Sequence, residues 1–394
     1  MKKLQLLLVL IIIIALPVFG QESAEMWIGL YDRIDTLEYK YSILQNIADT
    51  DDKGLVPLFQ KALNDSNLII QSSLDSNDKK FYDEIQKISI QNLGNFQVIE
   101  AEEDIYRAYK NTNILLVKTE SIVALGKMGS EKYIDDFIIT LRNINMRTES
   151  NTNMSDNEAI ASALVNYFEN IKNESSYEVV FYAATGWYSP RSGIKERAKN
   201  ALPSISSDPS NILKTIIEKD PSFSNKILAL STENESSASD ENKSKLATVG
   251  LNEGIRHIPN SVAESMELLS LRLLASNMLK TSSSKDPEAV PLMERILFDN
   301  YDVSEKLTVI EALSTYKSDE SVKTLSTYLK DLNKKQAEGM SPYIDRRAVI
   351  ATINALGESG KSAAREELII VTTIPTWSTA IQQSARTALD KLKK

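Results

Sequence analysis

The sequence predicts an all-α protein built from repeated helical hairpins, and three observations support this. Apolar residues recur at intervals of three and four along most of the chain, whereas the strict alternation of a half-buried strand is nearly absent. Glycine (13 residues) and proline (11) are scarce in a chain of 394, as expected of helices joined by short connections. Ala-Leu dipeptides also recur at similar places in successive predicted helices.

Apolar spacing and start signals agree in predicting about eighteen helices of ten to twenty residues. Two segments place their apolar side chains on one helix face: Ile134, Phe137, Ile138 and Leu141 in the first, and Val322, Leu325, Leu329 and Leu332 in the second. Asp302 with Glu305 three positions later predicts a capping box. Pro209, preceded by Asp208 as the candidate cap, predicts another helix start.

The Ala-Leu dipeptides indicate an internal repeat. Most are 33 to 43 residues apart, the length of one helical hairpin, and the one gap of 111 residues is three times 37: Ala124-Leu125, Ala163-Leu164, Ala201-Leu202, Ala312-Leu313, Ala355-Leu356 and Ala388-Leu389. Two copies extend to Ala-Leu-Gly-x-x-Gly, at 124–129 and 355–360. Alanine permits a close approach of two helices, leucine fills the space beside it, and we expect the paired glycines to end the helix.

On these residues the chain resembles HEAT-type repeat proteins, in which each repeat is a pair of antiparallel helices. The second helix of such a pair carries an early basic residue, then small residues and Ala-Leu-Gly. Here a lysine precedes the leucine by seven positions in three repeats, at Lys118, Lys195 and Lys306, and the last two repeats depart from this. The resemblance is best over 113–145 and 287–394. It implies a right-handed α-solenoid of antiparallel hairpins that serves as a binding scaffold.

The pattern divides the chain into five stretches. These are a signal peptide (1–20), an N-terminal helical cap region (21–112), HEAT-like repeats (113–230), a polar low-complexity loop (231–245) and further HEAT-like repeats (246–394). The cap region is less regular, as expected where a terminal repeat meets water. We interpret 231–245 as an insertion between helices of a continuous array, and a domain linker is the alternative.

The N-terminus has the pattern of a secretory signal. Lys2 and Lys3 precede an unbroken apolar run, Leu6–Leu16, and small residues near Gly20 favour cleavage before Gln21. The alternative is an uncleaved anchor, for which the run is short compared with a span of about 20 residues. Cleavage would change the formal charge from −9 to −11. We therefore expect a bacterial periplasmic or secreted protein without a transmembrane segment in its mature chain.

Composition excludes several kinds of chemistry. The chain has no cysteine and one histidine, so a disulfide, a thiolate nucleophile and any site of several imidazoles are excluded. Its acidity argues against a nucleic-acid partner. No nucleotide-binding, serine-hydrolase or zinc-protease motif occurs. We expect no catalytic, cofactor-binding or metal-binding residue, and we interpret His257 as a structural or surface residue.

Four residues are candidates for binding a protein: Trp187, Tyr188, Arg191 and Trp377. Tryptophan, tyrosine and arginine carry much of the binding energy at interfaces. In the alternative interpretation, the indole and phenol rings close a gap between two hairpins. The expected function is a scaffold that engages another cell-envelope protein. Two alternatives remain open: a self-assembling part of a motility or secretion machine, and an enzyme that uses two carboxylates.

Overall fold

The computed structural model describes residues 20–69, 74–147, 154–299, 301–340 and 344–392. Within these ranges the chain forms twenty α-helices, α2 to α21, with short 3₁₀ turns and no strand, which confirms the all-α prediction. None of the helices described is both long and apolar enough to cross a membrane. The predicted signal segment lies outside the described residues, apart from its last residue, Gly20.

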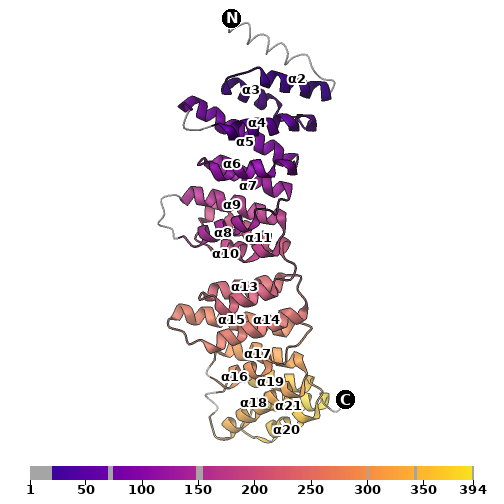
Figure 1. Ribbon diagram of the computed structural model, residues 1–394. Helices are drawn as coiled ribbons and strands as arrows, with labels where there is room; N and C mark the ends of the chain where they lie inside the picture. The colour runs from indigo at the N-terminus through magenta and orange to yellow at the C-terminus, as the bar shows by residue number, and fades with distance from the viewer. Residues whose placement is uncertain (1–19, 70–73, 148–153, 300, 341–343, 393–394) are drawn as a thin grey trace. The chain divides into compact units, whose positions relative to one another are not determined.

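The helices group into two compact units, with the boundary between Ser206 and Ser207. The N-terminal unit contains α2 (Gly20–Asp32), α3 (Leu37–Ile47), α4 (Val56–Leu68), α5 (Ser76–Asn95), α6 (Glu102–Asn111), α7 (Leu115–Met128), α8 (Ile134–Asn145), α9 (Met154–Ile171), α10 (Tyr177–Thr185) and α11 (Ile194–Ile205) (Figure 1). In this unit each odd-numbered helix from α3 to α9 packs against the next odd-numbered helix, and the series ends at α11. The helices α4, α6, α8 and α10 each pack against the odd-numbered helix that follows. The unit is thus a stack of helical hairpins.

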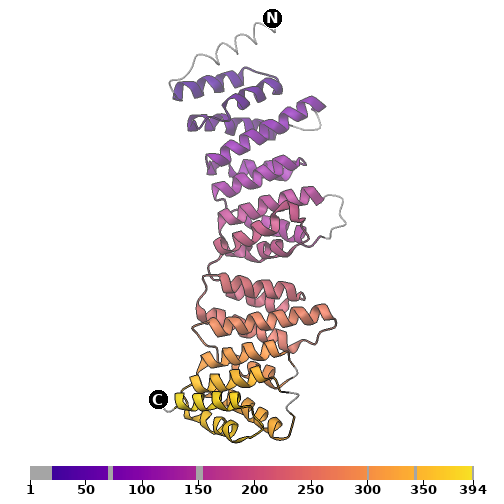
Figure 2. The same cartoon turned by 180° about the vertical axis from the view of Figure 1, so that it is seen from behind.

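The C-terminal unit repeats this arrangement. It contains α12 (Ser210–Lys219), α13 (Phe223–Glu235), α14 (Asp240–Arg256), α15 (Val262–Thr281), α16 (Ala289–Phe298), α17 (Val303–Tyr316), α18 (Asp319–Ala337), α19 (Arg346–Glu358), α20 (Arg365–Thr373) and α21 (Thr379–Lys391) (Figure 2). Odd-numbered helices from α13 to α21 form one row, and even-numbered helices from α12 to α20 form a second. The apolar core of the unit lies between these two rows.

The six Ala-Leu dipeptides of the predicted repeat lie on odd-numbered helices, namely α7, α9, α11, α17, α19 and α21, whereas Ala62-Leu63 lies on the even-numbered α4. All are buried except Leu389, which is half-buried in the last helix. The glycine after each extended dipeptide does not end the helix. A β-carbon at Gly126 would lie 3.0 Å from the Tyr167 backbone, and one at Gly357 would lie 2.7 Å from the Ala388 Cβ atom. These glycines therefore allow close packing of successive helices, and only the second glycine of each motif has a positive φ, at Gly129 and Gly360.

Both predicted helix starts are confirmed, the second to within one residue. Asp302 caps α17 by accepting a hydrogen bond from the Ser304 backbone N–H at 2.7 Å, and the Glu305 carboxylate accepts from the Asp302 N–H at 3.1 Å. Helix α12 begins at Ser210 with Pro209 as its N-cap, so Asp208, the predicted cap, lies one position before it and accepts from the Ser210 N–H at 3.3 Å. Since an aspartate side chain satisfies N–H groups that have no partner inside the helix, these short polar signals fix where each helix starts.

The polar stretch 231–245 is not one loop, contrary to expectation. Helix α13 continues to Glu235 and α14 begins at Asp240, so only residues 236–239 connect them. Ser239 caps α14 through the Asn242 N–H. The Lys243 ammonium group donates to the carbonyl oxygens of Asn234 and Ser236. Polar residues at exposed helix ends resemble a loop in composition, which explains why the prediction was wrong.

Candidate functional site

Three of the four predicted binding residues follow α10 in the N-terminal unit. Tyr188 is 1% exposed and its hydroxyl donates to the Asn145 amide oxygen at 2.5 Å. The Trp187 indole is half-buried and donates to the Ile144 carbonyl at 2.8 Å. Both rings therefore fasten this segment to the C-terminal end of α8, as the packing alternative predicts. Arg191 is exposed in the 3₁₀ turn Pro190–Ser192.

The fourth candidate, Trp377, lies in the C-terminal unit between α20 and α21. It is 5% exposed, and its indole N–H donates to the Asn333 side-chain oxygen of α18 at 3.1 Å. The indole is thus part of the helix packing. Little of its surface is available to a partner.

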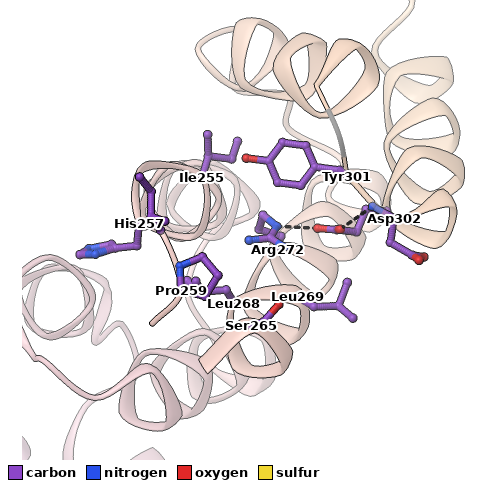
Figure 3. A pocket seen from close by; sticks show the side chains of 11 residues that line it. Ile255, His257, Pro259, Ser265, Leu268, Leu269, Arg272, Tyr301 and Asp302 are labelled. Atoms are coloured by element: carbon purple, nitrogen blue, oxygen red, sulfur yellow. Dashed lines mark hydrogen bonds and ion pairs between the residues drawn. The ribbon is translucent and has the colours of Figure 1, made fainter. Parts of the chain in front are cut away.

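A pocket of about 500 Å³ lies elsewhere in the C-terminal unit, where the C-terminal end of α14 faces the first half of α15 and the start of α17 (Figure 3). Its apolar wall includes Ile255, Leu268 and Leu269. Its polar wall includes Arg272 and Tyr301, whose side chains lie next to each other in Figure 3. We call this cavity the α15 pocket.

The polar wall is built around one buried ion pair. Arg272 Nε donates to Glu305 Oε1 at 2.5 Å, and Arg272 Nη1 donates to the Gly254 carbonyl at 2.8 Å. The guanidinium carbon lies 4.8 Å from the centre of the Tyr301 ring. Glu305 also closes the capping box with Asp302, so the ion pair is joined to the start of α17. A buried charge is tolerated when it is paired and hydrogen-bonded in this way.

Gly254 makes room for this arginine. A β-carbon at Gly254 would lie 2.5 Å from Arg272 Cγ, closer than non-bonded carbons approach one another. The absence of a side chain lets the arginine stem cross the α14 backbone and reach both the Gly254 carbonyl and Glu305. The pocket therefore depends on a glycine inside a helix, at a position where alanine would otherwise favour the helix.

A second buried ion pair adjoins the first. Lys226 of α13 contacts Glu253 Oε2 at 2.7 Å, and both side chains are almost fully buried. Arg256 Nε forms an ion pair with Glu253 Oε1 at 2.9 Å, and His257 Nε2 lies 3.4 Å from Oε2. The His257 ring meets the Phe223 ring edge-on. His257 thus packs against Phe223 and lies close to Glu253 at the end of α14, as expected of a structural residue.

An exposed apolar surface borders the pocket. Val262, Met266 and Leu269 are spaced four and three residues apart and share one face of α15, which we call the α15 stripe. Leu269 lines the pocket, whereas Val262 is 80% and Met266 64% exposed. Ile258, which also lines the pocket, is 86% exposed. This surface was not among the sequence predictions, although the apolar residues that follow His257 were a signal for it.

The chemistry available at the pocket suits binding. It offers apolar surface, a guanidinium group and the Tyr301 phenol, whose pKa is raised by burial so that its hydroxyl stays protonated. In the part of the chain that the structure describes, no three histidine, aspartate or glutamate side chains converge on a possible metal position. Of the two carboxylates that line the pocket, Glu305 is held by Arg272, and Asp302 accepts hydrogen bonds from the Ser304 backbone and hydroxyl.

No family model matches this chain, and no curated protein matches it. Among solved structures, it is similar to the crystal structure of an engineered protein, with 16% sequence identity and a TM-score of 0.37. That alignment covers 94% of this chain and 99% of the engineered one.

Proposed function

We propose that this chain is an exported protein-binding scaffold, a right-handed α-solenoid of HEAT-like hairpins that engages another cell-envelope protein. The observation that carries the proposal is the repeated packing of hairpins, in which each odd-numbered helix of a unit contacts the next. Each hairpin buries its apolar face against its neighbours and leaves the ends and outer faces of its helices available. Such a stack provides a long side-chain surface, which is what a scaffold needs.

Export is supported by the N-terminal sequence. The two lysines, the apolar run Leu6–Leu16 and the small residues near Gly20 together have the order of a secretory signal. The stability of the mature chain would rest on its helical core, since the sequence contains no cysteine to form disulfides. N-terminal sequencing of the protein recovered from the envelope fraction should find Gln21 as the first residue. Recovery of Met1 would argue for the retained anchor instead.

Crosslinking in intact cells tests the scaffold itself. The chain carries a C-terminal tag, is crosslinked and purified from the envelope fraction, and the recovered proteins are identified by mass spectrometry. We expect one or two specific protein partners that are absent when an unrelated tagged envelope protein is purified in parallel. Recovery of this chain alone would favour self-assembly, and recovery of no protein at all would contradict the scaffold proposal.

A further inference from the structure

We infer that the α15 pocket holds a segment of the partner protein that carries a bulky apolar side chain close to a lysine or arginine. This inference rests on the proposed function and names the place and the chemistry of the contact. Three properties of the pocket support it: its apolar extent, its free hydrogen-bond donor and its net charge.

The apolar extent indicates a macromolecular partner. From Val262 to Leu269 the α15 stripe is about 10 Å long at 1.5 Å per residue, and it continues into the pocket through Leu269. A small ligand lies mostly inside its cavity and would not contact an exposed apolar strip outside it. A contiguous exposed apolar surface next to a cavity is typical of a protein contact. One partner side chain would enter the pocket while its neighbours lie along the stripe.

The free donor belongs to Arg272. Its Nε and Nη1 atoms are bonded to Glu305 and Gly254, whereas Nη2 donates to none of the described residues. Because Glu305 neutralises the guanidinium charge, the remaining N–H groups suit a neutral acceptor better than a second carboxylate. A backbone carbonyl of an extended or terminal peptide segment is such an acceptor.

The net charge favours a basic residue in the partner. Arg272 and Glu305 compensate each other, while the Asp302 carboxylate on the same wall forms no ion pair with the described residues. Hydrogen bonds from the Ser304 hydroxyl and backbone lower the pKa of Asp302, so it stays ionised. The charged side chains that line the pocket, Arg272, Asp302 and Glu305, therefore sum to one negative charge, although Arg347 outside the lining also acts on Asp302. A lysine or arginine beside the apolar anchor would match this charge.

Peptide display on the purified chain tests this chemistry without knowledge of the natural partner. The probe is a phage library of random twelve-residue peptides. We expect the enriched peptides to combine a large apolar residue with a nearby lysine or arginine. Their affinity should fall at least tenfold for Met266→Glu, and Asp302→Asn, which keeps a good helix cap, should remove the preference for basic residues. Ile369→Glu, which changes an exposed apolar residue of α20 in the same way, should bind like the wild type.

Several results would overturn the inference. These are failure to enrich any peptide, enrichment of acidic peptides, and equal binding to the wild type and Met266→Glu. Photo-crosslinking in cells from a benzoylphenylalanine at position 266 separates this inference from the proposed function. A partner that the wild type recovers should crosslink from position 266 and not from position 369. If the partner is recovered but crosslinks only from other positions, the scaffold proposal holds and the pocket assignment is wrong. A crosslinked dimer of this chain would show that the pocket binds a second copy of the chain and not another protein.

Discussion

Substitution of Gly254 by alanine should destabilise the C-terminal unit, although the same change usually stabilises a helix. The new methyl group would lie 2.5 Å from Arg272 Cγ, so the arginine stem must move by roughly 1 Å to reach normal van der Waals separation. That movement pulls the guanidinium group away from the Gly254 carbonyl and from Glu305, both of which it now contacts at hydrogen-bonding distance.

The expected change in the free energy of unfolding is the sum of one stabilising and two destabilising contributions. Alanine in place of glycine inside a helix contributes about 1 kcal/mol of stability. Overpacking of a tightly filled site costs about 1–3 kcal/mol. Weakening a buried ion pair adds to this, up to about 3–5 kcal/mol if the pair breaks completely. We therefore expect a net loss of about 2–4 kcal/mol in the free energy of unfolding.

Urea unfolding followed by circular dichroism measures the effect, with Gly29→Ala as the matched control. Gly29 also lies inside a helix, α2, but nothing stands within 4 Å of the position of its new β-carbon. The control should unfold at the same or a higher urea concentration than the wild type. Because the chain has two compact units, midpoints rather than a single two-state free energy are compared. A Gly254→Ala midpoint equal to or above that of the wild type would refute the packing argument.

Three further substitutions test the remaining contacts. Glu305→Gln should lower the free energy of unfolding by about 3 kcal/mol, since it leaves the Arg272 charge buried without a counter-charge. An unchanged urea midpoint would show that water already solvates the Arg272 guanidinium group. Tyr188→Phe should cost about 1–2 kcal/mol by removing the hydrogen bond to Asn145, and partner recovery in the crosslinking assay should not change if the ring only serves packing. Burial raises the pKa of Glu233, one of whose oxygens has no partner among the described residues. The folded state thus binds a proton more tightly than the unfolded one, and this contribution to stability is present at low pH and lost as pH rises through the raised pKa. Glu233→Gln should therefore reduce the loss of stability between pH 5 and pH 7, measured by thermal unfolding, and an unchanged pH profile would contradict this assignment.

Local patterns in the sequence predicted the helices well because the forces that form them act over a few residues. The capping box of Asp302 and Glu305 was visible at a spacing of three, and the Ala-Leu dipeptides marked buried positions of the odd-numbered helices. The motif Ala-Leu-Gly was understood only in part. Its first glycine suggested a helix end, yet at Gly126 it permits contact with Tyr167, a residue 41 positions away that no local pattern identifies.

The candidate site depends on such distant pairs and therefore could not be derived from one sequence. Arg272 and Glu305 are 33 residues apart, and nothing near either residue indicates that they meet. The exposed apolar residues Val262 and Met266 have the same helical spacing as core residues do, so only the positions of neighbouring helices reveal that they are uncovered. The tryptophans show the opposite difficulty, because their residue type suits an interface as well as a core, and only the structure shows which distant acceptor each indole N–H meets.

The ion pair between α15 and α17 has a consequence for the order in which the chain acquires its structure. The hairpin of α14 and α15 carries Arg272 but not the carboxylate that neutralises it, which belongs to the next hairpin. During synthesis from the N-terminus, α14 and α15 emerge while Glu305 is still to come. Until it arrives, burial of an unpaired guanidinium group is unfavourable, so we expect this side of the hairpin to close only when its successor is present.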